Sequence, residues 1–438
     1  MLSLNNNTKI FLINFLLFSF PISFILGNLI INLNILILII TTFILYGRQI
    51  FEIKFSTVDK TVLLFFFYIV AIGIFNNYFN FDFSAPPHQE FLLTKSLAYT
   101  RYLLLYFVIK FLILKNLVKF KFLFICCGLS ALFVSIDIII QFYFGKDLFG
   151  FEGSGRRLSG LFQDEYIAGA YIQRFYIFMP LSMILYWLKE KKFFYYLLFF
   201  ITLLISLFGI MFSGNRMPLV LFIITLTIFL AYQKEFHKIL IVSLLVFIFS
   251  IYYLVNNNTN FHWHFKTFVN KGFQITSYFQ NKLYGNETNY LANTYVKEFE
   301  TGILTWKQNK IFGGGIKSFY FNCTKIKDSV MDKTGGTNCN SHPHNYYLQI
   351  AAELGLVGLI ITVYLFLIIL FKILRVLHYS KKNQDEKKIL IPFLALFIAE
   401  IFPFKTSGSF FTTSTSAYLF ILIPMIVSFA DYRINEIK

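Results

Sequence analysis

Charged residues are scarce in this chain of 438 residues: Asp, Glu, Lys and Arg make up 14% of it, against 57% hydrophobic residues. The mean hydropathy is +0.64. Because a soluble globular protein cannot bury so large an apolar share, the composition excludes that class. Apolar stretches of roughly 16–22 residues recur along the chain, and they do not alternate as the strands of an outer-membrane barrel do. The sequence therefore predicts an all-α polytopic membrane protein.

Acidic residues are the scarcer charge, with 22 Asp and Glu against 39 Lys and Arg, which gives a formal net charge of +17. In a soluble protein this excess would suggest a nucleic-acid partner. In a membrane protein the short cytoplasmic loops collect Lys and Arg, so the lipid bilayer is the expected partner and nucleic acid is not. The N-terminal apolar run also lacks a small-residue cleavage site, so we expect it to remain as the first span.

Hydropathy and length predict about twelve transmembrane helices. They fall at residues 10–26, 29–46, 61–75, 96–114, 122–144, 168–188, 193–212, 217–232, 239–255, 354–374, 389–402 and 416–430. The basic loops lie on one side, which the positive-inside rule assigns to the cytoplasm with both termini. We therefore expect a membrane domain with nine spans at 1–255, a long periplasmic loop subdomain at 256–345 before the tenth span, and a second membrane domain at 346–438.

Cysteine is rare, with four residues in the chain. Cys126 and Cys127 fall in the fifth predicted span, where packing is their expected role. Cys323 and Cys339 both fall in the long loop. If that loop faces an oxidising periplasm, these two cysteines could form a disulfide just before the histidines described next.

Two histidines, His342 and His344, stand at the end of the long loop, directly before a helical pattern begins. A helix N-terminus disfavours the imidazolium, so His344 is suited to act as a neutral general base. Two other interpretations stay open at this point. The pair could bind zinc together with His262, His264 or the loop cysteines, or His344 could simply cap or pack at the helix start.

Arginines on the outer side run against the positive-inside rule. Arg216 ends a Ser213-Gly214-Asn215-Arg216 turn at the start of the eighth span, where the positive end of the helix dipole also lies. Its rigid fork of donors matches phosphate geometry, so we favour an anion ligand over a snorkelling contact with lipid headgroups. Arg156, Arg157 and Arg174 form a second outward basic group, to which the same two interpretations apply.

The chain has no nucleotide-binding motif. The cluster Gly313-Gly314-Gly315 lacks the Lys-Ser/Thr of a P-loop, so we interpret it as a tight turn that folds the loop against the membrane. Lysines nearby, Lys307 among them, could support a bound anion. Two histidines with one residue between them in a loop are weak evidence for zinc, so we expect neither a metal nor another cofactor.

Four features, in order along the chain, carry a resemblance to a known family. They are Arg156/Arg157 followed by Phe162, the Ser213–Arg216 turn, a late outer loop with Trp306 and the glycine cluster, and His344-Asn345 ahead of Glu-Leu-Gly-Leu-x-Gly at 353–358. Together with the number of spans, this order resembles the O-antigen ligase and polymerase superfamily of bacterial inner-membrane glycan transferases.

The resemblance implies a GT-C-like glycosyltransferase that needs no metal and takes its donor, an undecaprenyl-diphosphate-linked glycan, on the periplasmic face. It implies that His344 is the catalytic base and that Arg216, Arg157 and Arg156 bind the donor diphosphate. Supporting roles are implied for the residues His342, Asn345, Lys307 and Arg174. The family's second essential arginine, in the long loop, has no counterpart, because no arginine lies between residues 255 and 374; Lys297, Lys307 or Arg157 could replace it.

Direct displacement of the diphosphate predicts inversion at the anomeric carbon. A ligase would join the glycan to a lipid A-core acceptor, whereas a polymerase would join lipid-linked repeat units by the same chemistry, and a protein acceptor is a third variant. A transporter or flippase is the alternative from another class, with Asp137 and Glu400 as its candidate intramembrane acids. The two halves of the chain do not match, as transporter repeats would.

Overall fold

The structure is a computed structural model that describes residues 5–78, 88–153, 157–186, 192–232, 236–257, 294–326, 339–379, 384–406 and 408–437, with scattered positions between 262 and 280. Within these residues the regular elements are helices, and the only extended pairing is an isolated bridge between Lys146 and Glu152. The prediction of an all-α polytopic membrane protein is confirmed.

The helices follow the chain in a simple order. They are α1 (Asn6–Phe18), α2 (Phe20–Leu26), α3 (Asn28–Tyr46), α4 (Thr57–Tyr78), α5 (His88–Tyr99), α6 (Arg101–Leu114), α7 (Phe120–Phe144), α8 (Ala168–Phe175), α9 (Phe178–Tyr186), α10 (Lys192–Phe212), α11 (Arg216–Tyr232), α12 (His237–Asn257), α14 (Thr294–Gln308), α15 (Phe319–Cys323), α17 (Tyr346–Tyr379), α18 (Gln384–Glu400) and α19 (Thr413–Ile437). Short 3-10 turns, η1 (Gly47–Glu52) and η3 (Gly160–Phe162), complete the set.

Each of the twelve predicted spans overlaps one or two helices of the structure. Some of these helices are too short to cross a membrane. Among the described residues, nine helical segments are long and apolar enough to cross a membrane. Two more, Arg216–Tyr232 and Ile389–Glu400, are apolar but shorter. The span expected at 168–188 is broken into α8 and α9. Polar residues of two of these segments, Arg174 and Arg216, line a cavity described below, where irregular backbone is tolerated.

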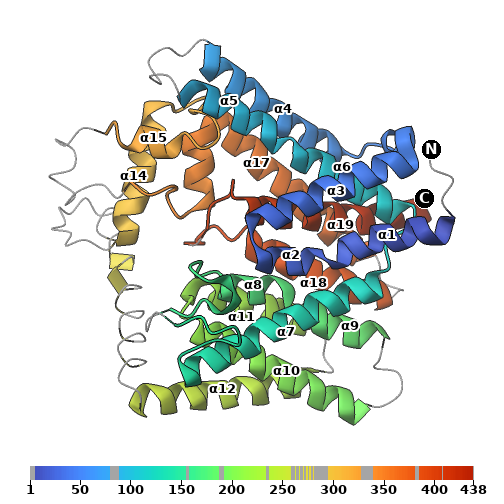
Figure 1. The fold of residues 1–438 in the computed structure, drawn as a ribbon, viewed down its shortest axis with the longest axis vertical. Helices are drawn as coiled ribbons and strands as arrows, with labels where there is room; N and C mark the ends of the chain where they lie inside the picture. Colours follow the sequence, from blue (N-terminus) through green and yellow to red (C-terminus); the bar gives the residue numbers. More distant parts are fainter. Residues whose placement is uncertain are drawn as a thin grey trace.

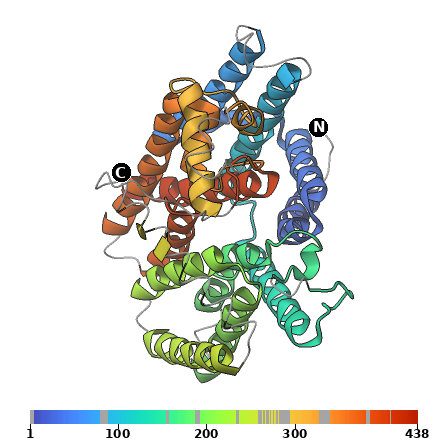
Figure 2. The same ribbon diagram turned by 90° about the vertical axis from the view of Figure 1, so that its left-hand side faces the viewer.

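The helices form two groups that meet along α18 and α19 (Figure 1). One group contains α3 to α6 with α17 and α19, and α6 packs against α19. The other contains α7 to α12, in which α7 packs against α10 and α9. Helix α11 packs against α18 and so joins the groups. Helix α14, yellow to orange, lies across the face turned to the viewer in Figure 2 and packs against α17.

Helix α17 is interrupted at Gly355, which has a φ of +67°. The segment around the glycine cluster fits into this break. Gly315 donates its N–H to the carbonyl of Glu353 (2.7 Å), and Leu356 donates its N–H to the carbonyl of Lys310 (2.8 Å). A Cβ on Gly313 would lie 2.4 Å from the Gly355 nitrogen, so only glycine permits the approach. The long loop is thereby fixed to the start of α17.

Helix ends that the sequence assigns to the cytoplasm share a buried ion cluster. Lys110 Nζ lies 2.5 Å from Asp59 Oδ2 and 3.2 Å from Asp431 Oδ2, and Lys372 also pairs with Asp431. Tyr106 donates to Asp59 Oδ1 (2.6 Å). These groups come from α4, α6, α17 and α19, so the cluster ties four helices together at one end.

Candidate active site

The start of α17 is capped by Asn345. Its Oδ1 accepts from the N–H groups of Tyr347 (3.0 Å) and Leu348 (3.1 Å), and its Nδ2 donates to the carbonyl of Pro403 (2.8 Å). A side-chain oxygen at this position satisfies helix donors that would otherwise lack partners. Asn345 is therefore a structural residue that joins α17 to the α18–α19 loop and holds the preceding His344 in place.

His344 has an unusual backbone, with a φ of +52°, a left-handed conformation that few residues other than glycine adopt. Such strain persists only where the surroundings impose it, and it is found often at functional sites. The His344 ring lies 4.3 Å, centroid to centroid, from the ring of His342, which bonds to the Ser341 hydroxyl through Nδ1 (2.9 Å). His344 Nε2 is 3.6 Å from Glu298 Oε1.

The surroundings of both imidazoles favour the neutral form. Burial, and to a smaller degree the Arg157 guanidinium, lowers the pKa of His344. Burial, with His344 and Lys317 nearby, lowers the pKa of His342 to about 3. A neutral imidazole can accept a proton, so the electrostatics of the site suit His344 as a base.

A cavity of about 1480 Å³ joins these histidines to the predicted arginines. Of the residues proposed from the sequence, it is lined by His342, His344, Arg157, Arg174 and Arg216. Its remaining polar lining includes Gln141, Glu165, Gln173, Asn215, Glu298, Tyr346 and Lys405. Residues as far apart in the sequence as Arg157 and Lys405, 248 positions, therefore line one cavity.

Of the three arginines that the resemblance assigns to the diphosphate, the two that the structure describes, Arg157 and Arg216, lie on adjoining segments. Arg216 is the first residue of α11. The N–H of Leu158, the residue after Arg157, donates to the Ser213 carbonyl (3.4 Å), so the Arg157 segment lies beside the turn that leads to Arg216. A Cβ on Gly169 would lie 2.6 Å from the Ser213 hydroxyl, which shows how closely α8 approaches the same turn.

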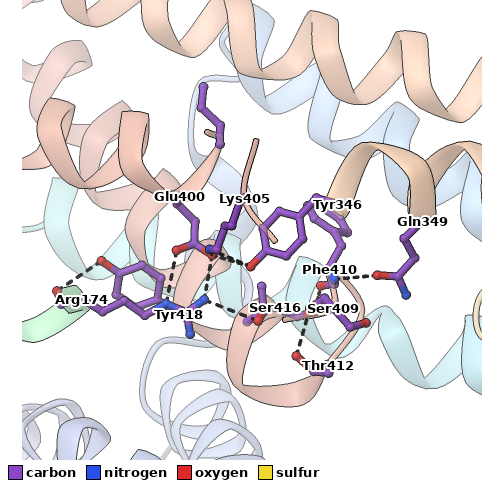
Figure 3. A network of polar contacts seen from close by, with 12 residues as sticks. Arg174, Tyr346, Gln349, Glu400, Lys405, Ser409, Phe410, Thr412, Ser416 and Tyr418 are labelled. Carbon is purple, nitrogen blue, oxygen red and sulfur yellow. Dashed lines mark hydrogen bonds and ion pairs between the residues drawn. The ribbon is translucent and has the colours of Figure 1, made fainter. Parts of the chain in front are cut away.

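Arg174, which the sequence analysis assigned to an outward basic group, is buried and paired inside the protein. It lies in α8 and forms a two-point ion pair with Glu400 of α18, with Nη2–Oε1 at 2.7 Å and Nε–Oε2 at 3.2 Å. Lys405 Nζ (3.0 Å) and the Tyr346 hydroxyl (2.8 Å) also contact Glu400 Oε1. Figure 3 shows the three donors around this carboxylate. Glu400 is thus neutralised inside the protein rather than left as an isolated intramembrane acid.

Lys405, Tyr346 and Glu298 were missed by sequence reasoning. Lys405 carried a usable signal, because it is a cation in an outer loop and so departs from the positive-inside rule as Arg216 does. It is 4% exposed and lies among the cavity-lining residues. Burial lowers the pKa of Lys405 to about 8, and the Glu400 carboxylate opposes that shift. No pattern in the sequence distinguished Tyr346 or Glu298 from other residues of an amphipathic helix.

The remaining predicted residues lie elsewhere. Lys307 is exposed on α14 and is not among the cavity-lining residues that the structure describes. Arg156 and His264 lie outside the described residues. Within the described part of the chain, no three His, Cys, Asp or Glu residues lie in a group that could hold a metal ion. Metal independence stays a prediction.

Cys323 and Cys339 are neighbours in a small apolar cluster with Phe319 and Ala352. Both are free thiols in this structure, and Cys323 Sγ donates to the Tyr320 carbonyl (3.3 Å). Burial raises the pKa of the Cys323 thiol, which favours its uncharged form. The proposed disulfide joins two residues that lie in the same cluster, and it stays a prediction.

The fold and the cavity define a polytopic α-helical membrane protein whose helix ends and loops surround an imidazole with several cations. Residues 201–363 match the family described as O-Antigen ligase, which supports membership of the O-antigen ligase and polymerase superfamily, as the motifs predict. The matched part runs from α10 into α17 and contains Arg216, Glu298 and His344. The match indicates a glycosyltransferase-like ligase or polymerase activity. No curated protein matches the chain.

Proposed function

We propose that this protein is an O-antigen ligase-like glycosyltransferase. It transfers a glycan from undecaprenyl diphosphate to an acceptor hydroxyl of lipid A-core, at the periplasmic face of the bacterial inner membrane. The observation that carries the proposal is the cavity itself, which brings His344 together with Arg157 and Arg216. The family match, which includes two of these three residues, agrees with this chemistry.

The cavity lining suits an amphiphilic donor. Its cationic part contains Arg157, Arg174, Arg216 and Lys405, whereas Glu165 and Glu298 are the acids that line it. Apolar side chains of the spans form the rest, including Phe142 of α7, Leu219 and Ile223 of α11, and Ile251 and Leu254 of α12. A prenyl chain can contact the apolar wall while its diphosphate meets the cations.

The proposed mechanism is a direct displacement. His344 takes the proton of the acceptor hydroxyl as its oxygen attacks the anomeric carbon, a contribution of about 10²–10⁴ in rate. The bond from that carbon to the diphosphate breaks, and the carbon is inverted. Arg216 and Arg157 stabilise the charge that develops on the diphosphate, an effect of about 2.7–4 kcal/mol for one donor in comparable sites. These charges allow departure of the diphosphate without a metal.

The family's second essential arginine has no counterpart in the long loop of this chain. Lys405 is our candidate for the cation that replaces it. Its ammonium has three donors, of which Glu400 and Tyr346 take two. Because Lys405 lines the cavity, the third donor can contact a phosphate oxygen. Arg174 stands beside it in the same network and orients Glu400.

The test is the surface glycan profile of a deletion strain. The proposal predicts bare lipid A-core, with long glycan accumulating on undecaprenyl diphosphate, because ligation alone is lost. Core that carries a single repeat unit would instead identify a polymerase. Loss of lipid-linked glycan from the periplasmic leaflet, with its retention in the cytoplasmic leaflet, would identify a flippase and contradict the proposal.

A further inference from the structure

Glu298 places a carboxylate against the candidate catalytic base. It belongs to α14, is 4% exposed, and lines the same cavity as His344. The separation of Glu298 Oε1 from His344 Nε2 is 3.6 Å. A glutamate is almost never buried to this extent unless its carboxylate is paired. Neither the family resemblance nor the sequence pattern assigns Glu298 one.

The approach of Glu298 depends on a glycine one turn further along α14. Residues 298 and 302 lie on the same face of a helix. A Cβ on Gly302 would lie 3.0 Å from Pro343 Cβ and 3.5 Å from Leu348 Cβ, so the bare backbone of α14 packs onto the segment that carries His344. Thr301 and Thr305, each 1% exposed, are buried beside it. This packing fixes the distance at which residue 298 faces residue 344.

A hydrogen bond also orients the Glu298 carboxylate. Asn340 Nδ2 donates to Glu298 Oε1 at 2.8 Å. A hydrogen bond from a neutral amide favours the ionised carboxylate. Asn340 belongs to the segment that leads into the two histidines, so the contact joins α14 to the histidine turn a second time. The side chain of Glu298 is therefore oriented by a partner that cannot itself titrate.

We propose that Glu298 is the positioning residue of His344: its carboxylate faces the Nε2 side of the ring at ion-pair distance and favours the tautomer with the proton on Nε2, which leaves Nδ1 to receive the proton of the acceptor hydroxyl. This inference rests on the proposed role of His344 as a base. The proton count is simple, since the hydroxyl proton passes to Nδ1 and the Nε2–H stays on the ring. The imidazolium that forms is then paired with a carboxylate.

Within the described part of the chain, charged or titratable groups reach His344 from three places: Glu298 from α14, Arg157 from the segment before η3, and His342 from its own turn. Arg157 disfavours an imidazolium, and the neutral His342 ring adds no charge. Glu298 is the group of the three that stabilises the protonated ring. Without it, the base would have to become a cation beside a guanidinium while remaining partly buried.

The pairing can be tested without a substrate. Diethyl pyrocarbonate acylates neutral imidazole but not imidazolium, so the rate of His344 modification against pH reports its protonation. The purified full chain in lipid nanodiscs is treated with the reagent, and fragment masses separate His344 from His342. In Glu298→Gln the midpoint for His344 should fall by about one pH unit. In the matched control Glu300→Gln, two residues along α14, the midpoint should stay at the wild-type value.

Equal midpoints for wild type and Glu298→Gln, in protein with unchanged thermal stability, would overturn the proposal. Glu298→Asp gives a second measurement, because a shorter carboxylate should retain the wild-type midpoint in part. Activity is scored as ligated surface glycan in the deletion strain. Glu298→Gln should lower it by about tenfold, a part of the ~10²–10⁴ that a general base supplies.

The two proposals fail in different ways. If His344→Ala abolishes transfer while Glu298→Gln changes neither the midpoint nor the glycan, the proposed function stands and the role of Glu298 is refuted. If Glu298→Gln shifts the midpoint but His344→Ala transfers glycan normally, the ion pair is real and the catalytic role of both residues is refuted. A shifted midpoint with lost transfer in both variants supports both.

Discussion

At the scale of single residues, the candidate site is built from cationic side chains that line the cavity. Arg174 and Lys405 share the carboxylate of Glu400, so part of their charge is neutralised inside the protein. Arg157 and Arg216 line the cavity from a loop and a helix start. An arginine can bind two phosphate oxygens at once through its planar fork, which a lysine cannot do.

Two substitutions of Arg216 should separate the contribution of its charge to donor binding from that of its planar guanidinium. Arg216→Ala should lower transfer by about 10²–10³-fold, the effect of removing one preorganised donor. Arg216→Lys keeps the charge and should recover only part of that loss. The measurement is the amount of ligated glycan in the deletion strain at equal protein level in the membrane. Full activity of Arg216→Ala would remove this residue from the account.

The pH dependence of transfer should contain a contribution from Lys405. Burial lowers its pKa to about 8, so its cationic form is present below that pH and disappears above it. Because the cation is the form that contacts the diphosphate, transfer should decline as the pH rises through about 8. In Lys405→Arg the alkaline decline should move to higher pH, since guanidinium does not deprotonate in this range. An unchanged alkaline limb in that variant would exclude Lys405 from donor binding.

At the scale of elements, the break in α17 connects the long loop to the histidines. Gly355 interrupts the helix and frees the N–H groups of Leu356 and Val357, which donate to the carbonyls of Lys310 (2.8 Å) and Ile311 (3.2 Å). The Glu353 carboxylate accepts the N–H of Lys317 (2.8 Å) from the same segment. The Glu-Leu-Gly-Leu sequence therefore encodes a docking point, and α14 reaches His344 because the loop is fixed there.

Gly355→Ala should detach this docking point. A Cβ at residue 355 would lie 2.2 Å from the Ile311 carbonyl oxygen, and the φ of +67° is unfavourable for alanine. The matched control is Gly27→Ala, where φ is +100° but no atom lies within 4 Å of the added Cβ, so it introduces backbone strain without a clash. Limited proteolysis should cleave the 294–326 region faster in Gly355→Ala only. Equal protection in both variants would contradict the docking role.

Particular residues show what the sequence could and could not predict at this scale. Spans were predictable because length and hydropathy alone determine which segments lipid can solvate. Arg216 and His344 stood out because they broke a rule of charge placement or stood at a helix start. Glu298 did not, because its role depends on the contact of Gly302 with Pro343, which joins segments 41 residues apart. The ion pair of Arg174 could not be predicted from the sequence, because its partner, Glu400, is 226 residues away.

At the scale of the whole molecule, one end of the helix bundle holds a buried ion cluster and another region holds the cavity. One end is closed by the ion cluster of Asp59, Lys110 and Asp431, in which Asp59 and Lys110 are 0% and 1% exposed. The cavity lined by His344 and the cationic side chains lies near the start of α17. Helices α4, α6, α17 and α19 meet at the cluster, so it stabilises the frame from which the cavity-lining loops extend.

Lys110→Met should therefore affect stability rather than chemistry. Removing one partner leaves the buried Asp59 carboxylate uncompensated, at a cost of about 3–5 kcal/mol. We expect a lower thermal midpoint for the purified protein and normal transfer for each molecule that remains folded. Lys115→Met, at an exposed lysine at the end of α6, is the control and should leave the midpoint unchanged. Equal midpoints for the two variants would show that the cluster does not stabilise the fold.

The central claim is that His344 is the base of a glycan transfer. Its most direct test is complementation of the deletion strain with wild type, His344→Ala or His344→Gln, each verified at equal level in the membrane by immunoblot. We predict that wild type restores ligated surface glycan, whereas both variants leave bare core with lipid-linked glycan accumulated. Restoration of the wild-type profile by either variant would contradict the assignment of His344.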